Sequence, residues 1–188
     1  MRPKDSIYVN SSAEYDKHKQ ALKHVLCPKC GVMGCLIRHG YLRGYGDGCA
    51  EKIQRGWRVY CSNRGLKKGC GKTYSILLAI HLYRRLVNAG RLWEFLKGVL
   101  DGSSIKKAWE KVASPFGLET GYKLWASFIR NQSHVRAHLH RLDKPVHFPA
   151  RVSEPALQLI LHLQSAFRPS ACPAASFQTV FQRAFLAR

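Results

Sequence analysis

The chain has 188 residues, enough for one ordinary domain or two small ones, and 46% of them are hydrophobic, so a packed core is expected and wholesale disorder is not. Lysine and arginine number 31 against 11 aspartates and glutamates, which gives a formal net charge of +20. Because so basic a protein repels itself unless a polyanion neutralises it, nucleic acid is the expected partner, with an anionic membrane surface as the competing one.

The cellular setting follows from what the sequence lacks. There is no run of 18 apolar residues, which excludes a transmembrane helix, and the polar start MRPKDSIYVNSSAEYDKHK has no apolar export segment. We therefore expect a cytoplasmic, nucleoid-associated protein. In that setting its seven cysteines indicate metal binding rather than disulfides.

Changes in composition divide the chain into four segments. Residues 1–24 are polar and predict a loosely ordered arm. Residues 25–75 hold six of the seven cysteines among short β-like runs, whereas residues 76–142 have the apolar spacing of helices. Residues 143–188 open with the linker DKPVHFP and continue as nearly uncharged helices. The expected fold is mainly α with a small β zinc ribbon, followed by a helical domain of helix-turn-helix type.

The cysteines form two pairs. Cys27-Pro-Lys-Cys30-Gly31 is a C-x2-C turn that places two thiolates on one side of a knuckle, and the second pair encloses eight residues before a Cys-Gly-Lys-Thr ending. Four thiolates in tetrahedral geometry suit structural Zn²⁺, whose binding would stabilise a segment too small for a full core. The expected Zn²⁺ ligands are Cys27, Cys30, Cys61 and Cys70, and the alternatives left open are Cys35, Cys49 and His39.

Basic and aromatic residues are interleaved between residues 38 and 72, where the only acids are Asp47 and Glu51. Such a surface suits a phosphate backbone and can stack on unpaired bases, although a solvated surface that shields the thiolates would look the same. The aromatic residues are Tyr41, Tyr45, Trp57 and Tyr60. The expected nucleic-acid contacts are Arg38, Arg43, Arg55, Arg58, Arg64, Lys67, Lys68 and Lys72.

Caps and turns divide the helical segment into separate helices. Apolar residues recur at three- and four-residue steps from Ile76 to Leu100, with Asn88-Ala89-Gly90 as a candidate break, and Ser103 or Ser104 then caps a short helix, SIKKAWEKVA. A turn at 114–117 leads into a longer helix from about residue 118. This is the outline of a helix-turn-helix, although three helices packed for other reasons give the same pattern. The expected DNA contacts on the second helix are Thr120, Tyr122, Lys123 and Arg130.

Taken together, CPKCG…IRHGYLRGYG…RGWRVYCSNRGLKKGCGKTYSILL and SIKKAWEKVA…GLETGYKLW resemble the N-terminal half of bacterial insertion-sequence transposases. The resemblance covers about residues 25–142. It implies a zinc ribbon, a helix-turn-helix that binds transposon ends, and a mobile-element context. The chain departs from such transposases in the wide second cysteine pair. It also departs where they continue into an RNase-H-like domain with three metal-binding carboxylates, since beyond residue 119 only Asp143 and Glu154 are acidic.

No catalytic constellation is expected. His138-Leu139-His140 matches the His-hydrophobe-His element of rolling-circle nucleases, but in the expected helix residues two apart diverge by about 200°. The remaining acids are scattered singly. We expect a non-catalytic, zinc-dependent protein that binds double-stranded DNA, as a transposase-like accessory factor or transcriptional regulator. The alternatives are a zinc-ribbon protein that binds RNA or ribonucleoprotein, and a protein–protein adaptor in a recombination or defence complex.

The tail is apolar and almost uncharged. SEPALQLILHLQSAF predicts one helix with proline in its first turn, and Phe177, Phe181 and Phe185 recur at four-residue spacing, which predicts one face of a second. These faces have to pack on something. The two hypotheses are the chain's own helical domain, and a homodimer or partner-protein interface.

Overall fold

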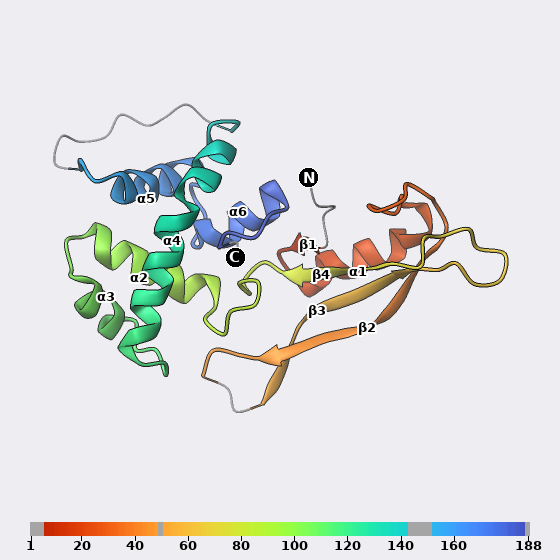
Figure 1. The fold of residues 1–188 in the computed structure, drawn as a ribbon, viewed down its shortest axis with the longest axis horizontal. Helices are drawn as coiled ribbons and strands as arrows, with labels where there is room; N and C mark the ends of the chain where they lie inside the picture. The colour runs from red at the N-terminus through yellow and green to blue at the C-terminus, as the bar shows by residue number, and fades with distance from the viewer. Residues whose placement is uncertain (1–5, 49–50, 143–151, 187–188) are drawn as a thin grey trace.

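The computed structural model describes residues 6–48, 51–142 and 152–186, with a four-stranded sheet towards one end of the long axis and a bundle of helices at the other (Figure 1). The strands are β1 (Ser6–Val9), β2 (Leu36–Tyr45), β3 (Lys52–Cys61) and β4 (Thr73–Leu78). The helices are α1 (Ser12–Ala21), the 3-10 helix η1 (Leu22–His24), α2 (Ala89–Leu100), α3 (Ile105–Lys111), α4 (Leu118–Leu139), α5 (Pro155–Ala166) and α6 (Pro173–Phe181). The expectation of helices together with a small sheet is confirmed. Within the described ranges, no helix is long and apolar enough to cross a membrane.

The sheet has the strand order β1-β4-β3-β2, with β1 parallel to β4 and the other pairs antiparallel. Side chains of β3 alternate, so Trp57, Val59 and Cys61 are buried on one face while Arg58 points to the other. Helix α1 covers the buried face, where Tyr15 stacks on Trp57 with ring centroids 3.6 Å apart. Trp57 is therefore a core residue, and its expected place on a nucleic-acid surface is wrong.

The N-terminal segment is ordered from residue 6, which corrects the expected loose arm. Strand β1 pairs with β4 from Ser6 to Val9, and Ser11 caps α1 by accepting a hydrogen bond from the Glu14 N–H. Only Tyr15 of α1 is buried. A single buried residue produces no apolar period, which is why the sequence concealed this helix.

Residues 76–86 are not helical, contrary to the expectation from their apolar spacing. Strand β4 continues to Leu78 and pairs with β3 along its length, and the first helix of the bundle begins only at Ala89. The Asn88 side chain marks that start by accepting the Arg91 N–H at 2.7 Å. Pairing with β3 decides the structure of this segment, and the expected domain boundary at residue 75 falls inside a strand.

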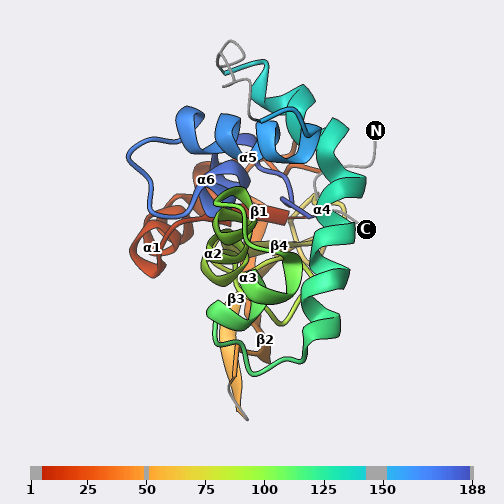
Figure 2. The same cartoon turned by 90° about the vertical axis from the view of Figure 1, so that its left-hand side faces the viewer.

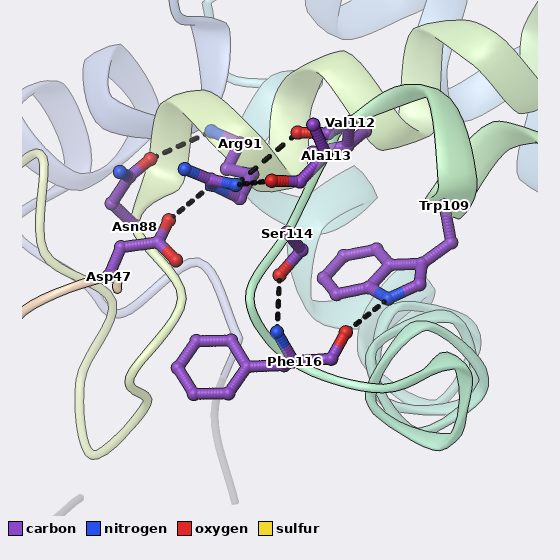
Figure 3. A network of polar contacts seen from close by, with 8 residues as sticks. All are labelled: Asp47, Asn88, Arg91, Trp109, Val112, Ala113, Ser114 and Phe116. Atoms are coloured by element: carbon purple, nitrogen blue, oxygen red, sulfur yellow. Dashed lines mark hydrogen bonds and ion pairs between the residues drawn. The ribbon is translucent and has the colours of Figure 1, made fainter. Parts of the chain in front are cut away.

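Helices α3 and α4 pack closely across their turn. Ser104 caps α3, as expected, and the indole Nε1 of Trp109 donates to the Phe116 carbonyl at 3.1 Å (Figure 3). Gly121 of α4 lies directly against this indole, since a Cβ there would come within 2.7 Å of its Cγ. The close approach of the two helices thus depends on a glycine.

The tail helices pack into the chain's own core. Leu159 of α5 and Phe177 of α6 are at most 1% exposed, in the same cluster as the apolar residues of α2 and α4. Helix α6 ends at Phe181, so Phe185 lies beyond it but is also fully buried. The apolar stripe considered as a partner surface is therefore inside the molecule. Figure 2 shows α5 and α6 against the bundle, with α4 along one side of it.

The long β2–β3 hairpin is tied to the helices near its tip. Arg91 of α2 forms an ion pair with Asp47, with 2.6 Å between Nε and Oδ2, and its Nη1 donates to the carbonyls of Val112 and Ala113 (Figure 3). The Asp47 side chain is only 5% exposed. One arginine thus joins the hairpin, α2 and the end of α3.

Candidate metal centre and basic surface

The fold brings the four expected cysteines together. The sulfur atoms of Cys27, Cys30, Cys61 and Cys70 all lie within 4.8 Å of one another, with 3.9 Å between Cys27 and Cys70 and 3.7 Å between Cys30 and Cys61. A tetrahedral site with metal–sulfur bonds of about 2.3 Å requires sulfurs about 3.8 Å apart. The cluster therefore has the dimensions of a site that can bind a metal ion.

The first knuckle holds its cysteines through backbone hydrogen bonds. The Gly31 N–H donates to the Cys27 carbonyl at 2.8 Å, and the Lys29 N–H donates to the Cys27 sulfur at 3.4 Å. Gly31 has a φ of +71°, a left-handed conformation that side chains disfavour. The glycine after the second cysteine is thus what lets the chain turn back under both thiols.

The second knuckle repeats this arrangement despite its different spacing. The Cys70 N–H donates to the Cys61 sulfur at 3.3 Å, and the Gly71 N–H donates to the Cys61 carbonyl at 2.9 Å. Gly71 has a φ of +67°, close to that of Gly31 in the first knuckle. The two pairs are therefore similar in backbone geometry.

The eight intervening residues form a loop whose base is closed by one backbone hydrogen bond, which we call the pinch. The Gly69 N–H donates to the Ser62 carbonyl at 2.9 Å, so these two residues stand where the two middle residues of a C-x2-C turn would stand. The hexapeptide 63–68 is extruded between them. This explains how Cys61 and Cys70 form a knuckle although they are nine positions apart.

The pinch predicts a specific loss of metal in Gly69→Ala. A Cβ at this position would lie 2.2 Å from the Ser62 carbonyl oxygen and 2.7 Å from the Cys61 sulfur, so the knuckle has to open. We expect metal affinity, measured by competition with a chromophoric chelator, to fall at least about tenfold. Gly65→Ala is the matched control in the same loop, because no atom lies within 4 Å of its Cβ and only its φ of +62° opposes the change. Equal affinities in the two variants would contradict the pinch.

Two neighbouring thiols of the cluster differ in acidity. A hydrogen bond from the Val32 N–H lowers the pKa of the exposed Cys30 to about 7, whereas burial raises the pKa of Cys61 to about 12. A bound metal ion would hold every ligand as a thiolate. Binding of a metal ion would therefore displace a proton from Cys61.

The alternative ligands lie apart from the four sulfurs. Cys35 is 4% exposed in the sheet core, outside the cluster, and its carbonyl accepts the Ser62 N–H at 2.7 Å. His39 is exposed on β2 beside the ring of Tyr60. Cys49 lies outside the described residues.

The extruded loop concentrates positive charge. Arg64, Lys67 and Lys68 are all exposed in it, Leu66 between them is 102% exposed, and Lys72 is exposed just beyond. No acidic residue occurs between positions 52 and 93. The cysteine cluster thus anchors both ends of a cationic loop at the far end of the sheet from the helical bundle (Figure 1).

The arginines of the sheet are divided between its two faces. Arg38 is exposed on the side of α1, with its guanidinium 4.7 Å from the ring centre of Tyr41. Arg58 is exposed on the opposite face, and Arg43 is exposed on β2 towards the hairpin tip. The pleat therefore places Arg38 and Arg58 on opposite faces of the sheet.

Arg55 was expected to be an exposed nucleic-acid contact, but it is not freely exposed. Its side chain is half-buried, and Nη2 donates to the Leu82 carbonyl at 2.8 Å. Burial lowers the pKa of its guanidinium. Arg55 therefore links β3 to the segment that follows β4.

The four candidates on α4 lie near its start or on its outer side. Thr120 is half-buried, whereas Tyr122, Lys123 and Arg130 are exposed. Lys123 forms an ion pair with Glu119 one turn earlier, with 2.6 Å between Nζ and Oε1, and this pair lowers the pKa of the Glu119 carboxyl. The outer side of α4 thus presents an aromatic residue and cations, partly offset by one acid.

Two polar residues beyond the sequence-based candidates lie next to Arg55. His81 and Arg84 follow β4 and line a pocket together with arginines of the hairpin. Both residues lie in the run HLYRRL at 81–86. Because a helix was expected there, their position beside the arginines of the sheet was not predicted.

Comparisons with protein families, with curated proteins and with solved structures find no match to this chain.

Proposed function

We propose that the chain is a non-catalytic, zinc-dependent DNA-binding protein, a transposase-like accessory factor or transcriptional regulator. The observation that carries the proposal is the extruded loop 63–68, in which a cysteine cluster immobilises the base of three exposed cations. A loop fixed in this way presents its charges to a phosphate backbone without first losing conformational freedom. The net charge of +20 supplies the wider field that attracts a polyanion.

Zinc is the metal that best suits the cluster. Four thiolates at tetrahedral spacing, each pair in a glycine-ended knuckle with an N–H···S hydrogen bond, match the donor set of a structural zinc ribbon. Zn²⁺ has no redox chemistry and all four positions would be filled by protein. We therefore assign it a structural role that leaves no open position for substrate.

The helices supply the second part of the proposed DNA contact. We interpret α3, the turn at 114–117 and α4 as a helix-turn-helix, in which α4 presents Tyr122 and Lys123 in its second turn and Arg130 two turns later. The loop and α4 lie towards opposite ends of the long axis (Figure 1). Duplex DNA is long enough to reach both, with the loop on the backbone and α4 on base edges.

RNA is the second candidate ligand, favoured by two exposed aromatics on β2. Tyr41 and Tyr45 are 47% and 48% exposed, and Arg38 and Lys52 respectively lie over their rings. Aromatic rings beside cations can stack on unpaired bases. This reading predicts a preference for structured or single-stranded RNA over duplex DNA.

The test is a titration of metal-quantified protein with duplex DNA, single-stranded DNA and structured RNA at several salt concentrations. We expect about one zinc per chain, a preference for duplex DNA, and a salt slope that falls by about 2 to 3 in the variant Arg64→Ala/Lys67→Ala/Lys68→Ala. Lys17→Ala/Lys19→Ala/Lys23→Ala is the control of equal charge loss, on the exposed side of α1 and η1.

Two outcomes would contradict the proposal. Equal slopes in the loop variant and its control would mean that net charge, rather than the fixed loop, determines binding. Tighter binding to structured RNA than to duplex DNA would favour the second candidate.

A further inference from the structure

A pocket of about 370 Å³ lies where the open face of the sheet meets the segment after β4. Arg58, Ser75 and Leu77 contribute from the face opposite α1, Arg43 and Arg55 lie at an irregularity of the β2–β3 pairing, and the segment contributes residues 81–84. Its volume is at the small end of the range for sites that hold small ligands or ligand fragments. The lining residues are Leu42, Arg43, Arg55, Arg58, Ser75, Leu77, His81, Leu82, Tyr83 and Arg84.

The charge of this pocket is one-sided. Arg43, Arg55, Arg58 and Arg84 line it, and no lining residue is acidic. None of the four forms an ion pair with an acidic residue in the described part of the chain. Burial and the charge of Arg55 both lower the pKa of His81, to about 4, so this imidazole is neutral at pH 7. The field of the arginines is thus left uncompensated.

The backbone around Arg55 is adapted to hold its side chain in this position. A Cβ on Gly44 would come within 2.9 Å of the Arg55 Cδ, so the side chain crosses β2 where a glycine leaves room. The hydrogen bond from Nη2 to the Leu82 carbonyl then fixes the guanidinium at the pocket wall. Half-buried charges are normally paired, and this one has a carbonyl oxygen and no carboxylate.

On the opposite wall of the pocket, the backbone of Arg84 also has an uncommon conformation. Arg84 has a φ of +55°, which is unfavourable for a residue with a side chain, and its guanidinium lies 5.1 Å from the ring centre of Tyr83. Arg58 stands across from Gly40 on β2 and from the small Ser75 on β4, so no large cross-strand side chain covers it. Arginines from the sheet and from the following segment thus face one space.

We infer that this pocket binds a phosphate group, most directly a backbone phosphate of the nucleic acid. Planar guanidinium groups bind phosphate oxygens in pairs of parallel hydrogen bonds, which makes arginine the usual residue for such a site. The segment after β4 that lines the pocket lies between the cationic loop and α4 along the long axis (Figure 1), where bound DNA would cross the junction of sheet and helices. The nucleic-acid source of the phosphate rests on the proposed function, whereas binding of the anion itself does not.

The test uses the full metal-loaded chain and two probes, pyrophosphate by calorimetry and duplex DNA by titration over salt. The pocket variant is Arg43→Gln/Arg58→Gln, which spares Arg55 because of its link to Leu82. The control is Lys17→Gln/Lys19→Gln on α1, which removes the same charge from the other face of the sheet. We expect the pocket variant to bind pyrophosphate at least about tenfold more weakly and to lose about 1 to 2 from its DNA salt slope. The control should change pyrophosphate binding by less than about twofold.

Each other outcome has a definite meaning. If pyrophosphate binding depends on the pocket arginines while DNA binding is unchanged or absent, the phosphate site stands and its source is a free phosphorylated ligand. The proposed function fails separately only where the parent protein also binds no DNA. If the chain does not bind pyrophosphate, or if pocket and control variants bind it equally, the inference is overturned even for a protein that binds DNA tightly.

Discussion

Replacing Cys61 with alanine is expected to remove the metal ion and unfold the sheet. Cys61 is fully buried at the end of β3, and its sulfur accepts the Cys70 N–H that closes the second knuckle. Structural zinc sites contribute apparent binding energies of about 10–16 kcal/mol, as much as the whole stability of a typical domain. We expect less than about 0.1 metal ion per chain and loss of the near-ultraviolet dichroism of the Tyr15–Trp57 stack.

Cys35→Ala is the matched control for this change. Cys35 is also buried in the sheet core, and the substitution removes the same atom, but its sulfur lies outside the cluster. It should lower the free energy of unfolding by about 1–2 kcal/mol through lost packing and should retain one metal ion. A Cys61→Ala protein that retained a full metal ion, or a Cys35→Ala protein that lost it, would mean that the ligand set is wrong.

The four clustered cysteines could be predicted from the sequence because each pair ends in a local turn with a recognisable sequence. Cys-Gly at the end of each pair marks a left-handed turn that places backbone N–H groups near sulfur, and this signal survives an insertion between Cys61 and Cys70. What the spacing did not reveal is how the insertion is closed. The hydrogen bond between the Gly69 N–H and the Ser62 carbonyl depends on the close approach of the two backbones. A pattern of apolar residues in the sequence gives no sign of such an approach.

The sheet boundaries could not be predicted because pairing between distant strands decides them. Leu78 and Leu82 lie four residues apart, as on one face of a helix, but Leu78 ends β4, whose Ile76 pairs with Trp57 of β3 and with Ile7 of β1. The same cause concealed β1, a short polar-flanked strand whose partner lies about seventy residues later. The helices α3 and α4 were predictable since caps and turns within their own sequence define them.

The polar links between sheet and helices had no sequence signal at all. Asp47 and Arg91 are single charges in unremarkable surroundings until the hairpin brings them together. The pocket arginines likewise come from three segments that only the fold makes adjacent. Charge composition therefore favoured a polyanion as the partner, but it could not indicate where a single phosphate would be held.

The second large effect is expected in the tail, where Gln178→Leu should destabilise the whole molecule. Gln178 of α6 is fully buried, and its Nε2 donates to the carbonyls of Ala79 at 2.7 Å and His81 at 3.3 Å. Its Oε1 accepts the Phe185 N–H at 3.2 Å. Leucine fills a similar volume but leaves three backbone groups without these partners, at about 1–3 kcal/mol for each that stays buried. We expect a loss of about 3–6 kcal/mol in the free energy of unfolding and a fall in Tm of about 10 °C or more.

Val180→Thr on the same helix is the control, since Val180 is 51% exposed and its replacement should change the free energy of unfolding by less than about 0.5 kcal/mol. The comparison decides what the tail does. Gln182, one turn after Gln178, also bonds to both backbone groups of Tyr8, so α6 holds the edge of the sheet as well as the segment after β4. If Gln178→Leu melts with Val180→Thr and the parent protein, α6 is a detachable appendage and its apolar face is available to a partner. If it melts far below them, the tail is the support that fixes the sheet and the helices in one relative position, and both sets of proposed DNA contacts depend on it.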